Sequence, residues 1–247
     1  MDLRFAAIGL LLLASCSAPP PIPAVLSDDA LTTTVDVLLL GEQHDAAVHQ
    51  EAHRQVVQAF VATGRLAALV LEMAEQGGTT TGLPPDADEA SVQAALHWKE
   101  SAWPWHAYGP AVMTAVSAGV PVIGANLTRP DMRTAMADDS LDGLLPGPAL
   151  EEQQQAIRIG HCNQLPESQI RPMTRVQIAR DRAIAGTISG AAVPGKTVVL
   201  LAGAGHVDPT VGVPRYLGTD LSYRSVQLLP QPSAKDYCAL FKRQLAP

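Results

Sequence analysis

The sequence VDVLLL at residues 35–40, followed at once by GEQH at 41–44, decides the fold of this chain. A near-continuous apolar run of this kind is typical of a strand buried on both faces of a parallel sheet. The arrangement recurs at residues 197–201 (TVVLL), which lead into GAGH at 203–206. Because parallel strands all end at the same edge of a sheet, we expect the two Gly-x-x-His turns to lie close together there.

Alternating strand and helix patterns continue along the rest of the chain. Apolar, β-branched runs predict three more strands at residues 67–72, 121–125 and 224–229. Helical patterns span residues 46–62, 89–96, 110–118, 151–159, 174–188 and 234–244. No strand pattern occurs between residues 129 and about 190, so this segment is predicted to be a helical insertion or lid. The alternation predicts an α/β domain over residues 34–247, with a mostly parallel sheet covered by helices on both faces.

Composition narrows the classes of protein that fit. The chain has 247 residues, of which 47% are hydrophobic, and this is enough to bury one substantial core. Its net charge of −7 and its lack of a Lys/Arg cluster argue against a nucleic-acid partner, because phosphate binding needs a basic surface.

The N-terminus carries a targeting signal. Residues 5–13 form an apolar stretch too short to span a bilayer, and LASC at 13–16 resembles a bacterial lipobox. We therefore expect residues 1–15 to be a signal peptide and Cys16 to carry the lipid. Residues 16–33, which contain PPPIP, are expected to form an extended tether. An ordinary cleaved signal with a chance cysteine is the alternative.

The lipobox also predicts a location and a redox environment. Ser17, rather than Asp, follows the cysteine, which in the lipoprotein analogy favours the bacterial outer membrane. The remaining cysteines, Cys162 and Cys238, would then lie in an oxidising compartment where a disulfide persists. One bridge and two unpaired thiols both remain open.

Ionisable side chains gather where the predicted strands end. Glu42 and His44 follow the first strand, Glu72 ends the second and His206 follows the fourth. Such a set suits acid–base catalysis with Glu42, His44, Glu72 and His206 as the catalytic residues. Alternatively His44, Glu72 and His206 suit a divalent metal such as zinc. Each residue alone could merely cap a helix, but four ionisable groups beside a buried sheet favour a shared function.

Several motifs, taken in order, resemble the ChaN-like haem-binding lipoproteins. They are GEQHD (41–45) with His49, LEM (71–73), the tryptophan-rich segment 98–108, ANL (125–127), Gln177 with Arg180-Asp181, and AGAGHV (202–207) with GVP (212–214). The resemblance extends from about residue 37 to residue 229. This family shares a superfamily with the Tiki proteases and the erythromycin esterases.

The resemblance implies a lipid-anchored protein that takes part in haem-iron uptake at the outer membrane. Haem would bind in a pocket formed between the subunits of a homodimer, with a tyrosine on the iron, and an outer-membrane haem receptor would be a partner. Tyr108 and Tyr216 are the candidates for that tyrosine, while Tyr223 and Tyr237 look structural. Tyr108 could instead pack with the tryptophans and hydrogen-bond through its hydroxyl.

Further haem contacts are expected around this tyrosine. The predicted haem-binding set is Tyr108, Tyr216, His49, Trp105, Asn126 and Arg129. Arg180 and Arg182 are further candidates for pairing with the haem propionates. His53 fits a solvated neighbour of His49 on the same helix, and His97, His106 and His161 fit surface or packing roles better than ligand roles.

Three functions follow from these observations. Haem binding without turnover is the first, and a metal-dependent or His/Glu-dependent hydrolase is the second. A surface-tethered scaffold with an idle site is the third.

Overall fold

The computed structural model describes residues 34–233 and 235–245. The predicted signal peptide (1–15), the lipidation site Cys16 and the tether (16–33) lie outside the described residues. Within the described part of the chain, no helix is both long and apolar enough to cross a membrane.

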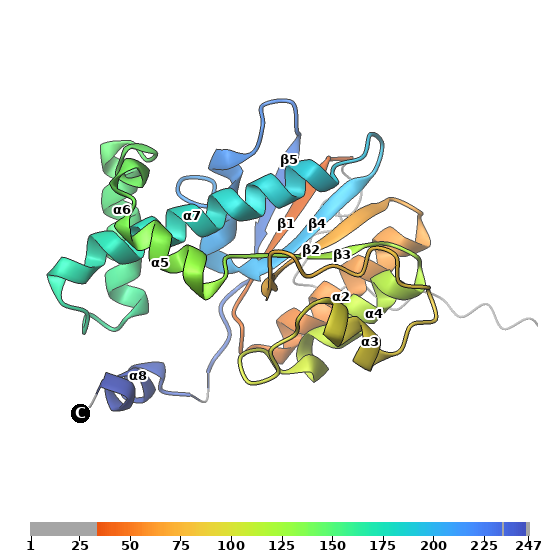
Figure 1. Cartoon of the computed structure of the whole chain (residues 1–247), viewed down its shortest axis with the longest axis horizontal. Helices are drawn as coiled ribbons and strands as arrows, with labels where there is room; N and C mark the ends of the chain where they lie inside the picture. The colour runs from red at the N-terminus through yellow and green to blue at the C-terminus, as the bar shows by residue number, and fades with distance from the viewer. Residues whose placement is uncertain (1–33, 234, 246–247) are drawn as a thin grey trace, which may run out of the picture.

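Five parallel strands form one sheet in the order β3-β2-β4-β1-β5 (Figure 1). The strands are β1 (Val37–Glu42), β2 (Leu66–Glu75), β3 (Val122–Asn126), β4 (Thr197–Gly203) and β5 (Tyr223–Gln227). They confirm the predicted α/β fold and all five predicted strands. One boundary differs in a way that matters, because β2 continues to Glu75 and places Glu72 inside the strand rather than at its end.

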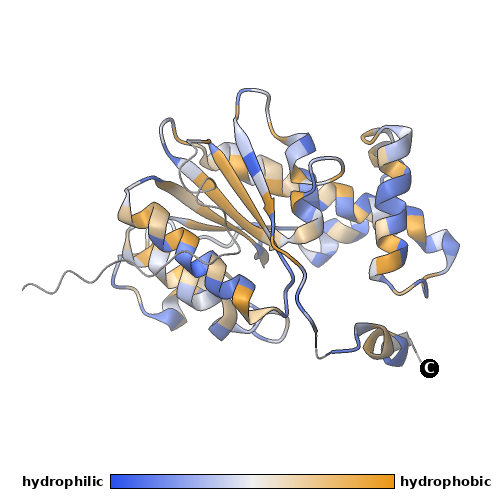
Figure 2. Ribbon diagram, turned by 180° about the vertical axis from the view of Figure 1, so that it is seen from behind, coloured by the Kyte–Doolittle hydropathy of each residue, from blue (hydrophilic) through white to orange (hydrophobic). Residues whose placement is uncertain are grey.

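Helices cover both faces of the sheet (Figure 1). On one face lie α2 (Ala47–Ala62), α3 (Glu89–Ala95) and α4 (Trp105–Ser117), whose apolar residues join the larger core cluster. On the other face lies α7 (Glu167–Ala191), whose Ile184 and Ile188 pack on the sheet. Figure 2 shows the central strands in the hydrophobic colour, as burial on both faces requires.

The strand period of two decides which face receives each polar side chain. Leu38 and Leu40 point towards α2 and α4, so Glu42, two residues further, points the same way. Val70 points towards α7, so Glu72 points towards α7. The two carboxylates therefore leave neighbouring parts of one sheet edge towards opposite faces.

The predicted helical insertion consists of helices alone. Between residues 129 and 190 the chain forms α5 (Arg129–Ala137), the 3₁₀ turn η1 (Asp139–Gly143), α6 (Gly147–Gly160) and most of α7. Two helices begin earlier than predicted: α4 begins at Trp105 instead of residue 110, and α7 begins at Glu167 instead of residue 174. The reason is that Pro110 and Pro172 lie inside these helices rather than at their ends.

The C-terminal helix is linked to the insertion by a covalent bond. Cys238 in α8 (Tyr237–Leu245) forms a disulfide with Cys162, which follows α6. Of the two alternatives that the sequence leaves open, the structure therefore has the bridge. Near this bond the rings of His161 and Phe241 lie 5.5 Å apart. The bond ties α8 to the C-terminal end of α6.

Candidate functional site

Glu42 is buried at the end of β1 and accepts hydrogen bonds from three elements. Tyr108 Oη of α4 donates to Oε1 over 2.5 Å, His44 Nδ1 lies 2.7 Å from the same oxygen, and Gln50 Nε2 of α2 donates to Oε2 over 2.9 Å. His53 Nδ1 lies 3.3 Å from Oε2. Burial opposes ionisation of Glu42, but the hydrogen bond with His44 and the charges of His53 and His44 hold its pKa below the usual value.

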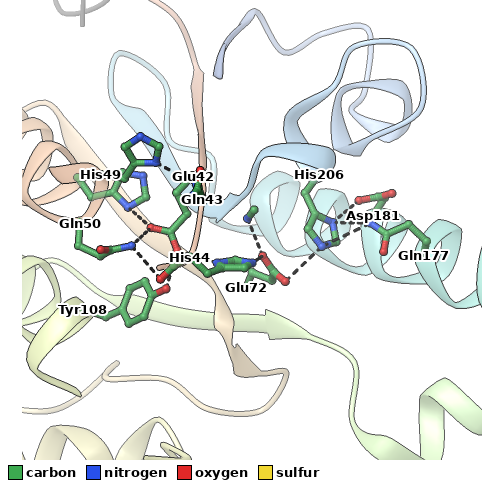
Figure 3. Close-up of polar contacts among 12 residues, drawn as sticks. Glu42, Gln43, His44, His49, Gln50, Glu72, Tyr108, Gln177, Asp181 and His206 are labelled. Carbon is green, nitrogen blue, oxygen red and sulfur yellow. Dashed lines mark hydrogen bonds and ion pairs between the residues drawn. The ribbon is translucent and has the colours of Figure 1, made fainter. Parts of the chain in front are cut away.

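Glu72 lies between two imidazoles (Figure 3). Its Oε2 accepts the backbone N–H of Gly203 over 2.7 Å and lies 3.7 Å from His44 Nε2. Its Oε1 lies 3.3 Å from His206 Nε2. Burial again opposes ionisation, and the charge of His206 outweighs it, so the pKa of Glu72 is held well below its usual value.

His206, on the 3₁₀ turn η2 (Ala204–Val207), is held by a second carboxylate (Figure 3). Its Nδ1 lies 2.5 Å from Asp181 Oδ1, and Asp181 comes from the buried face of α7. Despite burial, the charges of Glu72 and Asp181 raise the pKa of His206 to about 10. Burial raises the pKa of Asp181 to about 6, against the opposing charge of His206. The protonated imidazole is therefore shared by two carboxylates.

His44 is the solvent-facing member of this chain of groups. Its side chain is 39% exposed, whereas those of Glu72 and His206 are each 6% exposed. Partial burial opposes protonation of His44, but the hydrogen bond to Glu42 and the charge of Glu72 raise its pKa above the usual value. Its ring also contacts Trp103 edge to face, with 4.8 Å between the ring centroids. The buried groups can therefore exchange a proton with a ligand through His44.

Two cavities meet at His44. One, of about 610 Å³, lies between the sheet edge and helices α6 and α7 and contains Glu72 and His206 in its wall. The other, of about 750 Å³, is lined in part by Trp103 and Tyr237. His44, Asp45 and Tyr237 line both cavities. Volumes of this size are typical of small-molecule sites.

The structure brings together the four predicted catalytic residues Glu42, His44, Glu72 and His206. The geometry of the described residues gives less support to the predicted metal site at His44, Glu72 and His206. Among the residues that the structure describes, no group of three or more His, Cys, Asp or Glu side chains is arranged to hold a metal ion. The Nδ1 atoms of His44 and His206 face Glu42 and Asp181, and their Nε2 atoms face Glu72 at ion-pair distance. Metal binding therefore stays a prediction from the sequence alone.

The two tyrosines predicted as iron ligands are turned inward. Tyr108 is 2% exposed, its hydroxyl donates to Glu42, and burial followed by the charge of Glu42 raises its pKa far above the usual value. Tyr216 lies on the 3₁₀ turn η3 (Val213–Tyr216), where its hydroxyl is buried without a hydrogen-bond partner in the described structure. Burial, and then the charge of Asp181, raises the pKa of Tyr216 to about 12. Tyr237, expected to be structural, is instead 48% exposed and lines both cavities.

His49 and His53 are buried in α2. His49 is 0% exposed: its Nδ1 accepts the backbone N–H of Gln43, and its Nε2 lies 3.1 Å from the carbonyl oxygen of Leu229. His53 is 1% exposed, so the sequence prediction of a solvated neighbour is wrong; burial lowers its pKa to about 4. Both imidazoles lie beneath the site, where His49 contacts the backbone of Gln43 and Leu229 and His53 contacts Glu42.

Three further predicted haem contacts lie away from the two cavities. Trp105 is in the core and its indole N–H donates to Glu89. The side-chain oxygen of Asn126 accepts the backbone N–H of Leu127, and Arg129 is exposed at the start of α5. Of the tryptophans, Trp103 is the one that lines a cavity near His44.

Asp181 and Gln50 are functional positions to which sequence reasoning assigned no role. Asp181 lies on the same face of α7 as the buried Ile178, Ile184 and Ile188. A carboxylate at that spacing within an apolar stripe signals a buried, paired charge. The hydrogen bond from Gln50 to Glu42 could not be predicted in this way, because glutamine is common in the polar turns of helices.

Comparison with known proteins identifies related sequences and folds. Residues 31–217 match the family described as haem-binding uptake, Tiki superfamily, ChaN. The structure resembles one titled "Cofacial heme binding to ChaN of Campylobacter jejuni", with a TM-score of 0.60, 21% identity, and coverage of 74% of this chain and 75% of that one. A structure of the type III effector HopBA1 has a TM-score of 0.34 and 18% identity, over 69% of this chain and 67% of that one. No curated protein matches the sequence.

Proposed function

The chain belongs to the ChaN family of haem-binding uptake proteins in the Tiki superfamily, and we propose that it binds haem as a lipid-anchored protein of the bacterial outer membrane. The observation that carries the proposal is the family match over residues 31–217. The two cavities that meet at His44 support it, because together they offer room for a large planar ligand. Binding and release of haem need no turnover by the protein.

Tyr237 is the phenol best placed to reach a haem iron. It is half exposed and lines both cavities beside His44, and its hydroxyl hydrogen-bonds to Asp45. Tyrosinate is a known axial ligand of haem iron, and the hydroxyl loses its proton on binding. Tyr108 would first have to leave Glu42, which costs a buried carboxylate one of its hydrogen bonds.

A spectroscopic titration tests haem binding and the ligand together. The purified protein is titrated with haemin, and the absorbance spectrum is recorded for wild type and for Tyr237→Phe, Tyr108→Phe and Tyr216→Phe. We expect a saturable Soret change in wild type and loss of the tyrosinate bands in Tyr237→Phe alone. No saturable change in wild type sinks the haem proposal. A wild-type spectrum from Tyr237→Phe refutes only the choice of ligand.

The proposed membrane location depends on Cys16. If Cys16 carries the lipid, a Cys16→Ala variant is released into the periplasmic fraction while wild type stays with the outer membrane. Retention of the variant in the membrane contradicts lipid anchoring at this position.

The acid–base chain favours a second candidate function, a hydrolase. A protonated imidazole held between Glu72 and Asp181, beside the exposed imidazole of His44, can deliver and accept protons at a bound ester or amide. A panel of chromogenic esters and peptides, with His44→Gln and His206→Gln as variants, tests this function with and without added divalent metal. Activity lost in both variants supports it, and inactivity of wild type on the whole panel counts against it.

A further inference from the structure

Arg180 contributes a positive charge to the wall of the 610 Å³ cavity. Within the described residues its guanidinium forms no ion pair. Its Nη2 donates a hydrogen bond to Met132 Sδ over 3.2 Å, and its Nε is buried without a hydrogen-bond partner. The buried Nε is costly in this state, because this donor has given up water without gaining an acceptor.

Two amide side chains line the same cavity with unused hydrogen-bonding capacity. Gln153 of α6 is 5% exposed and lines the cavity, yet its amide makes no hydrogen bond within the described part of the chain. Gln177 of α7 also lines it, and its Nε2 lies 3.2 Å from His206 Nδ1, with no described partner for its oxygen. Gln177 is half-buried, and both amides can donate hydrogen bonds to a ligand in this cavity.

Three carboxylates line this cavity, and none forms an ion pair with Arg180, because each has its own partners. Asp45 accepts hydrogen bonds from Gln43 and Ser233. Glu42 is satisfied by Tyr108, Gln50 and His44. Glu72 is satisfied by Gly203 and the two imidazoles. Asp181 feels the charge of Arg180 but is itself paired with His206, so the guanidinium keeps no ion pair of its own at the wall formed by α6 and α7.

We propose that Arg180, together with Gln153 and Gln177, forms a subsite for a ligand carboxylate. The planar guanidinium fork matches a carboxylate in shape, and the amides can donate further hydrogen bonds to its oxygens. A singly charged group suits the site better than a phosphate dianion, which Glu72 and Glu42 in the same cavity would repel. The carboxylate is a haem propionate if the proposed function holds, or the carboxylate of another small molecule if it does not.

Two probes test whether the subsite binds a carboxylate and whether that carboxylate is a haem propionate. The first is the propionate ion, added to isotope-labelled protein while the side-chain amide signals of Gln153 and Gln177 are followed by NMR. The second is a comparison of haemin with haemin dimethyl ester, whose propionates carry no charge. Both are applied to wild type, Arg180→Gln and the control Arg182→Gln. Arg182, the other arginine of α7 predicted to pair with a propionate, is exposed and lines neither cavity, so its replacement removes the same charge outside the subsite.

In wild type and Arg182→Gln we expect saturable shifts of both amide signals with propionate. In Arg180→Gln the affinity should fall about 10- to 100-fold, as expected for a charged hydrogen-bonded pair. The same fall for haemin, with none for the dimethyl ester, supports the subsite and identifies the haem propionate as its source. Propionate binding lost in Arg180→Gln, while haemin and its ester bind alike, supports the subsite and assigns it to another carboxylate.

Two outcomes overturn the proposal. One is the absence of amide shifts with propionate in wild type, and the other is equal behaviour of Arg180→Gln and Arg182→Gln in folded protein. Failure of haem binding itself is distinguishable, because propionate would still shift the amide signals while haemin gave no spectral change.

Discussion

The first glycine of each Gly-x-x-His turn, Gly41 or Gly203, packs closely against the other turn. A Cβ on Gly41 would lie 2.9 Å from Cα of Ala204 and 2.4 Å from Cγ2 of Val207, in the second turn. A Cβ on Gly203 would lie 2.8 Å from Nε2 of His44, in the first turn. The two turns therefore pack against each other, and the absence of side chains at these glycines lets His44 and His206 approach the same carboxylate.

Substitution of Gly41 tests this contact. Gly41→Ala should lower the free energy of unfolding by about 1–3 kcal/mol, because the added methyl group meets backbone atoms that cannot move aside easily. Gly205→Ala is the matched control in the same motif, since a Cβ there meets nothing within 4 Å, and it should stay within about 0.5 kcal/mol of wild type. Urea unfolding measures both, and equal effects would contradict the close-contact argument.

The hydroxyl of Tyr108 is expected to stabilise ionised Glu42. Tyr108→Phe keeps the packing but removes the donor to Oε1, so the free energy of unfolding should fall by about 1.5–3 kcal/mol, and the pKa of Glu42 should rise. The control Tyr223→Phe, at a 42% exposed position of β5, should have little effect. Urea unfolding of wild type and the two variants measures these free energies. A Tyr108→Phe protein as stable as the control would refute the stabilising hydrogen bond from Tyr108 to Glu42.

Residue-level prediction succeeded where position along a strand decided the outcome. Glu42, His44, Glu72 and His206 could be grouped because each lies in or just after the C-terminal half of a strand, and parallel strands share this edge of the sheet. The hydrogen bond between Tyr108 and Glu42 could not be predicted, because it joins residues 66 positions apart that meet only through the packing of α4 on α2.

Among the elements, the strands were predictable and two helix starts were not. Buried apolar runs identify strands of a parallel sheet with little ambiguity. Proline within a helical pattern is more often a boundary, yet Pro110 and Pro172 each lie inside a helix. In the first turn of α4, before Pro110, the ring of Trp105 packs against Gly109. A Cβ on Gly109 would lie 2.6 Å from this ring, and the close contact stabilises the extra turn.

The C-terminal segment is held to the site by polar contacts and by the disulfide. Ser233 donates to Asp45, the backbone N–H of Gln231 donates to Gln43, and Cys238 is bonded to Cys162. Tyr237 lies between these attachments and lines both cavities. The position of this tyrosine in the site therefore depends on the bridge.

Removal of the disulfide should loosen α8 and destabilise the protein. Cys238→Ser opens a loop with a sequence separation of 76, so the free energy of unfolding should fall by about 2–4 kcal/mol. Amide hydrogen exchange in α8 should accelerate, while exchange in α2 and α4 keeps its rank order. Cys162→Ser should reproduce both effects, and unchanged exchange in α8 in either variant would show that the polar contacts alone hold it.

At the scale of the whole molecule, strand order explains why the site exists. Because β4 lies between β1 and β2, the turn after β4 reaches both Glu42 and Glu72. Glu42 points towards α2 and α4, Glu72 points towards α7, and the loop containing His44 joins the two. The strand pattern predicts a shared edge but not this order, because adjacency within a parallel sheet depends on how the crossover helices pack.

This arrangement should make the stability of the whole protein fall at alkaline pH. The pKa of His206 is raised from its ordinary 6.5 to about 10, so its contribution is fully present below pH 6.5 and is lost as the pH rises through 10. Asp181, with a pKa of about 6, is ionised before most of this window. Asp181→Asn removes one of the two carboxylates that hold the proton, so its alkaline decline should end at a lower pH. Urea unfolding between pH 6.5 and pH 10 measures the free energy of unfolding of each protein. The control His106→Gln, at an exposed position, should follow the wild-type curve. An Asp181→Asn curve that matches wild type would contradict the shared proton.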